Sequence, residues 1–217
     1  MFQWCSSITE APYLSATTLK RGCYSYMFSR CSSIVKVQDT LPATTLEAGC
    51  YSSMFSYTQI TDAPYLPSTA LSEECYFGMF SYCSSLVNVQ GTLPATIMKR
   101  DCYNSMFQRC TSLVNAPTLP SVSLENRCYH AMFQGCTSLV NAPDLPAQRL
   151  EISSCGQMFT DCSALKRIKC LATIIGRNST FMWVYGVSPT GTFIKNANAT
   201  WERGDNGIPS GWSIENA

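Results

Sequence analysis

Thirteen cysteines and a single histidine are the side chains of this 217-residue chain that could do the most chemistry. Thiols at this density suit either a set of disulfides or a metal site. No Cys-x-x-Cys pair occurs, so nothing supports a zinc ribbon. An odd number of cysteines also leaves at least one thiol unpaired in a monomer. The spacing of the cysteines must therefore decide between these uses.

The other residues of the sequence give little sign of a catalytic site. One histidine leaves few options for a triad, and the sequence contains no nucleophile elbow, P-loop, His-Glu-x-x-His or EF-hand string. The carboxylates are few and scattered, so no general acid and base pair stands out. We therefore expect no catalytic residue, no metal and no cofactor, and we do not expect an enzyme.

The composition narrows the classes of partner. Charged residues make up 13% of the chain, the net charge is +1 and the pI is about 7.4. A nucleic-acid-binding protein would normally carry a basic face, so nucleic acid is not an expected partner. No window of 18 apolar residues occurs, so we expect no membrane insertion by this chain. Serine and threonine, 27 and 20 residues, supply much of the polar surface instead.

An internal repeat organises the chain. The dipeptide Met-Phe recurs at steps of 25 to 27 residues, beginning at residues 1, 27, 54, 79, 106, 132 and 158. The fullest copies, Cys102 to Pro120 and Cys128 to Pro146, read Cys-Tyr-x-x-Met-Phe-x-x-Cys-x-Ser-Leu-Val-Asn-Ala-Pro-x-Leu-Pro. A fixed period of this length is typical of solenoids, in which each unit covers its apolar face by stacking on the next.

The repeat sorts 11 of the 13 cysteines into two columns. The first column contains Cys23, Cys50, Cys75, Cys102 and Cys128, with Ser154 in the last copy and Cys155 displaced to the Tyr position. The second column contains Cys5, Cys31, Cys83, Cys110, Cys136 and Cys162, with Thr58 in the third copy. Thiols copied with the fold are more typical of small buried hydrophobes than of a metal or redox site, so we interpret them as free and buried.

The first half of each unit has helical spacing. Leu46, Cys50 and Met54 show the pattern, in which apolar residues stand at i, i+4 and i+8. This stripe predicts a helix of about three turns that starts at the Pro-Ala-Thr stretch, with Thr44 as a plausible N-cap. The tyrosine after each first-column position would pack between such helices with its hydroxyl at the rim. The alternative is an exposed aromatic strip that binds sugars. These tyrosines are Tyr24, Tyr51, Tyr76, Tyr103 and Tyr129.

The second half of each unit predicts a short strand. The segment Leu113 to Leu119 is too short for a helix and ends at a proline. Its unit resembles leucine-rich repeats of the BspA-like type, found in Bacteroidetes surface proteins. Their pattern has a Cys, a Leu three residues on, an apolar residue three further and a Leu-Pro exit. Cys136 to Ala142 followed by Leu145-Pro146 matches it, with one extra residue before the exit and a different first half.

The resemblance covers residues 1 to about 172 and implies an α/β solenoid with a parallel sheet on its concave side. We expect seven copies in residues 1–172, the first of them truncated, and a small β-rich C-terminal cap in residues 173–217. Because the first copy starts at the Met of its motif, we also expect this sequence to be part of a longer protein. The resemblance further implies a cell-surface or secreted protein with an adhesion-type role.

A polar position recurs on the predicted strand, just before its second apolar anchor. We name it the polar column: Glu10, Lys36, Asp62, Asn88, Asn115, Asn141 and Arg167. Neighbouring parallel strands would stack these side chains about 4.8 Å apart, in a column of roughly 29 Å. Alternating signs at Glu10, Lys36 and Asp62 favour lateral pairing. The column is either a solvated strand face whose neighbours pair with each other or a polar binding surface. Tyr13 and Tyr65 would add contact area beside it.

We therefore expect a non-catalytic module that holds a protein or glycan on this face. The alternative is a structural spacer, or a component of a phage tail or cell-surface assembly. Fold alone does not decide between them.

Overall fold

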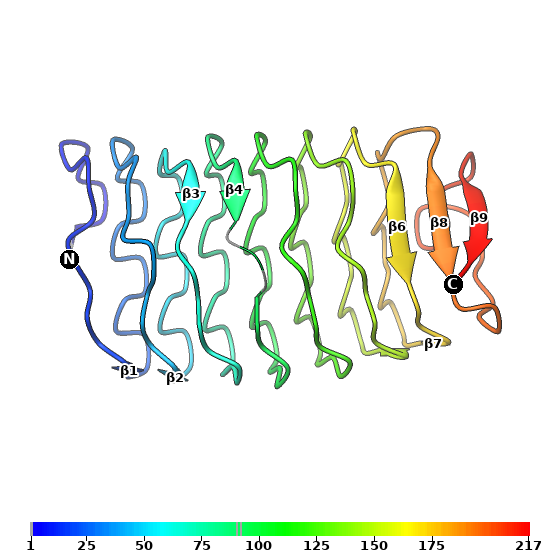
Figure 1. Cartoon of the computed structure of the whole chain (residues 1–217), viewed down its shortest axis with the longest axis horizontal. Coiled ribbons are helices and arrows are strands. Elements are labelled where there is room, and N and C mark those ends of the chain that lie inside the picture. Colours follow the sequence, from blue (N-terminus) through cyan, green and yellow to red (C-terminus); the bar gives the residue numbers. More distant parts are fainter. Residues whose placement is uncertain (1, 90, 92) are drawn as a thin grey trace.

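The computed structural model describes residues 2–89, 91 and 93–217 as a row of about eight coils. Consecutive coils lie side by side from the N-terminal to the C-terminal end of the row (Figure 1). The predicted solenoid is confirmed. Met1, which begins the first repeat copy, lies outside the described residues, as do Gln90 and Thr92 of the fourth copy.

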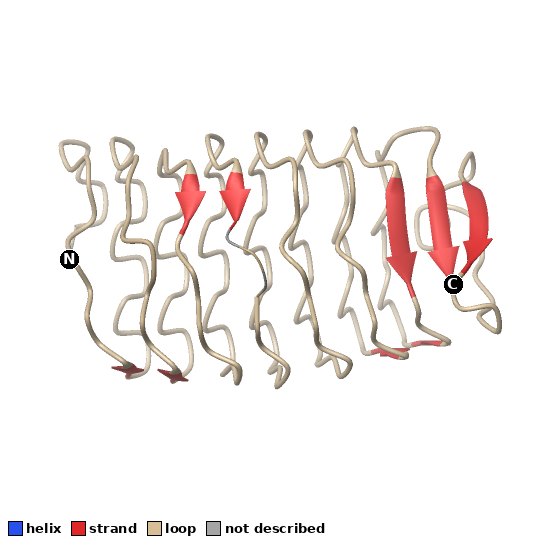
Figure 2. Ribbon diagram, viewed as in Figure 1, coloured by secondary structure: helices blue, strands red, loops and turns tan. Residues whose placement is uncertain are grey.

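The described residues form no helix, so the predicted helix in each unit, and with it the α/β class, is wrong (Figure 2). The stretch that carries the Leu, Cys and Met stripe is a chain of tight turns, which we name the turn segment of each coil. In the second coil it covers residues 20–31. Thr44, expected as an N-cap, leads instead into a short strand that starts at Thr45.

Hydrogen bonds in the turn segment alternate between two directions. Ser25 N donates to Gly22 O at 3.1 Å, three residues earlier in the same coil. The residue before it, Tyr24, donates its N–H to Cys50 O of the next coil at 2.9 Å. The same alternation continues along the segment and through the following coils. An α-helix would satisfy every N–H from its own chain at i−4, whereas here every second donor depends on a neighbouring coil.

The turn segments also place every fourth residue in the left-handed region of backbone space. In the second coil these are Gly22, Tyr26 and Arg30, with φ of 62°, 54° and 61°, and in the fifth coil Asp101, Ser105 and Arg109, with φ of 55°, 56° and 57°. A type II turn requires such a residue at its third position. The four-residue period of the turns brings Leu, Cys and Met to one side almost as the 3.6-residue helical period does, which explains the wrong prediction.

The strands are short and all pair in parallel. The pairs and their order are β1 with β2, β3 with β4, β5 with β7, and the three-stranded sheet β6–β8–β9. Their bounds are β1 Thr18–Leu19, β2 Thr45–Leu46, β3 Asp62–Ala63, β4 Asn88–Val89, β5 Arg149–Leu150, β6 Arg167–Cys170, β7 Ile174–Ile175, β8 Thr192–Lys195 and β9 Ser213–Asn216. The β3, β4, β6, β8 and β9 segments, with the intervening coils, form one side of the molecule, which we name the strand face (Figure 2).

The core between the turn segments and the strand face is built from aromatic stacks. The phenylalanines of the Met-Phe dipeptides stack coil on coil, with centroid separations of 5.6 to 6.0 Å from Phe2 to Phe159. Trp183 continues the stack after Phe159 at 6.1 Å. Offset stacking at these distances adds to the stabilisation that burial already gives. Each Met-Phe dipeptide thus contributes one ring to a continuous stack in the core.

A second stack contains the tyrosines that follow the first cysteine column. From Tyr51 to Tyr129 they are almost fully buried, with centroids 5.6 to 6.1 Å apart. The prediction that they pack is confirmed, but no helices lie between them. The expected hydroxyl at the rim is wrong for Tyr76, whose Oη is buried and has no hydrogen-bond partner among the described residues.

All 13 cysteines are free thiols, and 11 of them are buried. In the second column the thiol donates to the phenylalanine carbonyl of the preceding coil, as in Cys110 Sγ to Phe80 O at 3.2 Å and Cys136 Sγ to Phe107 O at 3.1 Å. Burial raises the pKa of Cys83 to about 11 and that of Cys50 to about 12. Cys23 is exposed and Cys5 is half-buried.

The chain beyond residue 172 extends the stack. Residues 178–186 repeat the turn segment, and Phe159 N donates to Trp183 O at 2.9 Å. Trp201 then stacks on Trp183 at 5.4 Å, and Asn206 accepts from Met182 N at 2.6 Å through its side chain. These contacts close the last coil as a cap would. The domain boundary at residue 172 stays a prediction.

The left-handed positions give a test of the turn segment against a helix. Glu74 has φ of 54°, whereas its neighbour Glu73 does not have a positive φ, and both are exposed. We expect Glu74→Gly to be about 1 kcal/mol more stable than Glu73→Gly, because only the former relieves left-handed strain. Urea unfolding measures the difference. Equal losses in the two variants, as a helix would give, would contradict the turn segment.

Thiol accessibility gives a second test. With a thiol reagent at neutral pH we expect Cys23 to react first and the half-buried Cys5 more slowly. The 11 buried thiols should stay protected until urea unfolds the chain, because burial both blocks access and disfavours the reactive thiolate. Mass spectrometry of the modified peptides identifies the sites. Rapid labelling of Cys110 in the native protein would contradict the buried column.

Candidate functional site

The polar column predicted from the repeat is aligned across the strand face. Glu10 bridges to Lys36, and Asp62 pairs with Asn88 through β3 and β4. Asn115 bridges to Asn141, and Asn141 bridges to Arg167. Beyond Arg167 the register continues to Thr192 and Ser213. Residues that lie 21 to 26 positions apart in sequence therefore stand next to each other, as the strand prediction requires.

The middle of the polar column is paired internally. Asp62 Oδ1 accepts from Asn88 Nδ2 at 2.7 Å, and Asp62 Oδ2 accepts from Thr61 Oγ1 at 2.6 Å. Hydrogen bonds that favour the carboxylate lower its pKa, so the pKa of Asp62 lies below its ordinary value, first through Thr61 and then through Asn88. This part of the column matches the expectation of a solvated face whose neighbours pair.

Charge pairing occurs at the far end of the column rather than at its start. Among the described residues no ion pair joins Glu10, Lys36 and Asp62, although their alternating signs favoured one. Arg167 Nη1 instead lies 2.9 Å from Asp144 Oδ1. Lys169 Nζ lies 3.6 Å from the other oxygen of Asp144. The repeat pattern did not single out Asp144 and Lys169, because the other copies do not carry charges at those positions.

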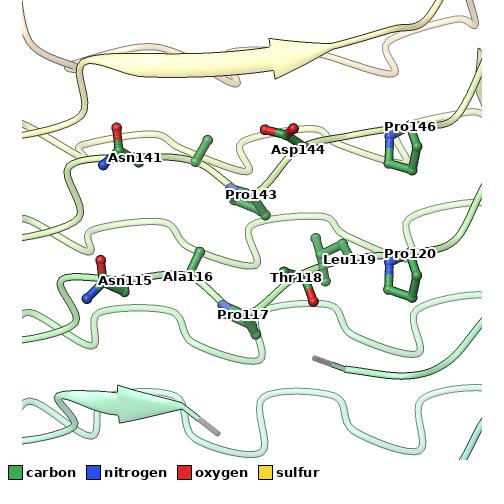
Figure 3. A pocket seen from close by; sticks show the side chains of 11 residues that line it. Asn115, Ala116, Pro117, Thr118, Leu119, Pro120, Asn141, Pro143, Asp144 and Pro146 are labelled. Atoms are coloured by element: carbon green, nitrogen blue, oxygen red, sulfur yellow. The ribbon is translucent and has the colours of Figure 1, made fainter. Parts of the chain in front are cut away.

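A groove of about 370 Å³ opens on the strand face between the fifth and sixth coils. Figure 3 shows the two coils contributing residues in matching order. Asn115 and Asn141 stand at one end, Pro120 and Pro146 at the other. The prolines and alanines of the two Asn-Ala-Pro motifs form much of the lining, together with Thr118, Leu119 and Asp144. The groove falls within the size range of small-ligand pockets, roughly 300 to 1,000 Å³.

The amides of this groove are free of internal partners. Neither the Asn115 nor the Asn141 side chain makes a hydrogen bond to another described residue, and both are exposed. Each amide offers one acceptor and two donor hydrogens. The backbones of the two residues are bridged, so the two amides extend from neighbouring positions on the strand face. This pair can therefore bind a polar ligand without first breaking contacts within the protein.

The two tyrosines lie on the strand face but at its other end. Tyr13 is 78% exposed and lines a hollow of about 170 Å³ with Glu10 and Lys36. Tyr65 is 38% exposed, and its backbone bridges to Thr40 of the preceding coil. A further hollow is lined by Lys36, Asp62 and their neighbours in the second and third coils. The predicted site residues therefore share one face but occupy several hollows.

The remaining chemical candidates form no catalytic or metal arrangement in the part of the chain that is described. No group of three or more His, Cys, Asp and Glu residues there could hold a metal ion. His130 is partly buried, and its Nδ1 has no partner among the described residues. Burial lowers the pKa of His130. No described helix is long and apolar enough to cross a membrane.

No protein-family model matches the chain, and no curated protein matches it either. Among solved structures the chain is similar to a leucine-rich repeat protein from Bacteroides ovatus, at 13% identity and a TM-score of 0.27. The similarity covers 99% of this chain and 76% of that chain. The two structures superpose too poorly for this likeness to support a functional argument, so the site rests on the geometry of the chain itself.

The Asp62–Asn88 contact predicts a measurable titration. Removing the amide in Asn88→Ala should raise the pKa of Asp62, because the carboxylate loses a donor. A depressed folded-state pKa contributes stability above the unfolded pKa, and this stability is lost as pH falls through the folded value. NMR titration of the carboxyl carbon measures the shift. Asn115→Ala is the control, and an equal shift in both variants would contradict the contact.

Proposed function

We propose that this chain is a non-catalytic binding module whose strand face holds a protein or a glycan. The observation that carries the proposal is the groove at Asn115 and Asn141, where two free amides face a lining of prolines and alanines. Ligand sites typically combine such an apolar lining with a few fixed polar groups. The Asp62–Asn88 pair offers a contrast, because its polar atoms already satisfy each other.

Rigidity of the site supports the same proposal. Asn141 bridges to both Asn115 and Arg167, and Arg167 is in turn held by Asp144. The side chains beneath this region, Leu139 and Leu165, are fully buried. A surface already ordered in the free protein loses little conformational entropy when it binds. The groove therefore meets the physical requirement for recognition without induced folding.

The resemblance of the repeats to a known type suggests where in the cell this function takes place. The Cys-x-x-Leu and Leu-Pro motifs resemble those of BspA-like leucine-rich repeats. On that basis we propose a role at the cell surface or in a secreted protein of a bacterium, with adhesion as the outcome of binding. Catalysis and nucleic-acid binding are not part of the proposal.

A second candidate function is that of a structural spacer, in a cell-surface assembly or a phage tail. It is favoured by the unbroken Phe stack, which extends through seven coils and gives the molecule a stiff axis. A spacer needs no ligand on the strand face, so ligand binding distinguishes the two functions.

The double variant Asn115→Ala, Asn141→Ala tests the binding module. A glycan array and purified candidate proteins first identify a ligand of the wild-type chain, and calorimetry then compares affinities. We expect a loss of about tenfold or more, since two ligand hydrogen bonds are removed. Stability should change little because both side chains are exposed.

The matched control is Asn126→Ala with Asn198→Ala, two exposed asparagines outside the groove. This control should keep wild-type affinity. Unchanged affinity in the Asn115, Asn141 variant, or an equal loss in the control, would count against the groove. The absence of any glycan or protein ligand would favour the spacer.

A further inference from the structure

A stack of cationic and aromatic side chains runs along the coil edge where each turn segment ends. We name it the edge ladder: Trp4, Arg30, Tyr57, Tyr82 and Arg109. These five residues take the last left-handed position of five successive coils. The ladder is separate from the strand face, so it does not depend on the function proposed above.

Each member of the edge ladder lies within about 6 Å of the next. The Arg30 guanidinium carbon lies 4.5 Å from the Trp4 ring centre and 4.2 Å from that of Tyr57. Tyr57 and Tyr82 stack at 4.4 Å with their planes 6° apart. Arg109 lies 5.9 Å from the Tyr82 ring centre. All these contacts are within the range of cation–π and stacking attraction.

The ladder ends at Gly135 in the next coil. A side chain there would come within 3.0 Å of Arg109 Cγ, so the glycine leaves room for the Arg109 stem. The stack therefore holds both of its guanidinium groups in defined places.

Arg30 lies against two aromatic rings and Arg109 against one, and both side chains stay exposed. A guanidinium donates all its hydrogen bonds in its plane, so the stacked groups keep their donors. Arg30 and Arg109 are exposed, and neither guanidinium contacts a carboxylate or any acceptor among the described residues. Six of the other 13 basic side chains form ion pairs: Lys20, Arg100, Arg127, Arg149, Arg167 and Lys169.

The spacing of these two cations fits an extended anion. Arg30 and Arg109 are three coils apart, which corresponds to about 14 Å at the usual separation of parallel strands. A stacked guanidinium is well suited to bidentate contact with a carboxylate or a sulfate. Between the two cations stand the Tyr57 and Tyr82 rings, whose hydroxyls make no hydrogen bond to another described residue. The ladder thus places two tyrosine hydroxyls between two guanidinium groups along one line.

The aromatic rings of the ladder favour a sugar over the bases of a nucleic acid. Tyr57 and Tyr82 already stack on each other at 4.4 Å, so bases could not insert between them as they do on open aromatic platforms. Trp4 is 65% exposed and has Arg30 over its ring. A sugar ring can lie against the exposed part of this side chain while its polar groups reach the ladder edge.

We propose that the edge ladder binds an extended anionic glycan, with Arg30 and Arg109 contacting its carboxylates or sulfates. Calorimetry of the full chain at low salt tests this with a short oligogalacturonate, a heparin-derived oligosaccharide, a neutral cello-oligosaccharide and an oligoglutamate. We expect binding of at least one acidic sugar. Comparing the oligogalacturonate with the heparin-derived oligosaccharide shows whether carboxylates or sulfates are preferred. The neutral sugar should bind at least about tenfold more weakly, because it lacks the charge-assisted contacts.

Variants locate the site. The double variant Arg30→Gln, Arg109→Gln should lower the affinity for the acidic sugar by at least about tenfold. Its binding should also depend less on salt concentration. Arg21→Gln with Arg177→Gln removes the same charge from exposed positions off the ladder and should preserve binding. Circular dichroism checks that both double variants keep the wild-type fold, as expected for exposed side chains.

Four outcomes would overturn the proposal. They are no binding of either acidic sugar, equal binding of the neutral sugar, equal losses in the two double variants, and tighter binding of oligoglutamate than of the sugars. The last would assign the ladder to an acidic peptide. None of these outcomes bears on the Asn115 groove, which is unchanged in every variant.

Discussion

The structure depends on one interaction, the backbone hydrogen bond between equivalent residues of successive coils. In the turn segments, donors such as Tyr24 N and Phe28 N have no partner in their own coil and reach Cys50 O and Met54 O of the next. Buried amides left unpaired are costly, so a single coil would not be stable. Stacking satisfies them, and it forces equivalent side chains into columns. The Phe stack, the buried Tyr stack and the cysteine columns follow from that single requirement.

Those columns explain the unusual composition. A thiol is small enough to fill the space beside the Phe stack, and in the second column it also donates to a carbonyl of the preceding coil, as Cys162 Sγ does to Phe133 O at 3.0 Å. At Thr58 a hydroxyl takes the place of the thiol and donates to Phe55 O of its own coil at 2.8 Å. What the position requires is a short side chain with a hydrogen to donate. This requirement accounts for the abundance of cysteine without disulfides or metal.

Surface columns are the functional counterpart of the core columns. Outward positions are free to differ between coils, so each column combines residues that the sequence keeps far apart. On the strand face this produces both a self-satisfied pair, Asp62 with Asn88, and a free pair, Asn115 with Asn141. On the coil edge it places Arg30 between Trp4 and Tyr57. Binding sites of different chemistry can therefore form on one scaffold without changing its core.

The sequence alone determined the solenoid, the register of its coils and the membership of the polar column, because a fixed period brings equivalent residues together whatever the local conformation. It could not reveal the turn segment, since turns of four residues and a helix of 3.6 residues per turn place Leu46, Cys50 and Met54 on one side alike. Left-handed residues distinguish the turn segment from a helix. Many of them, such as Tyr26 and Ser105, are not residue types that favour a positive φ. Only the tertiary structure decided which polar side chains pair and which stay free, because that depends on contacts between coils.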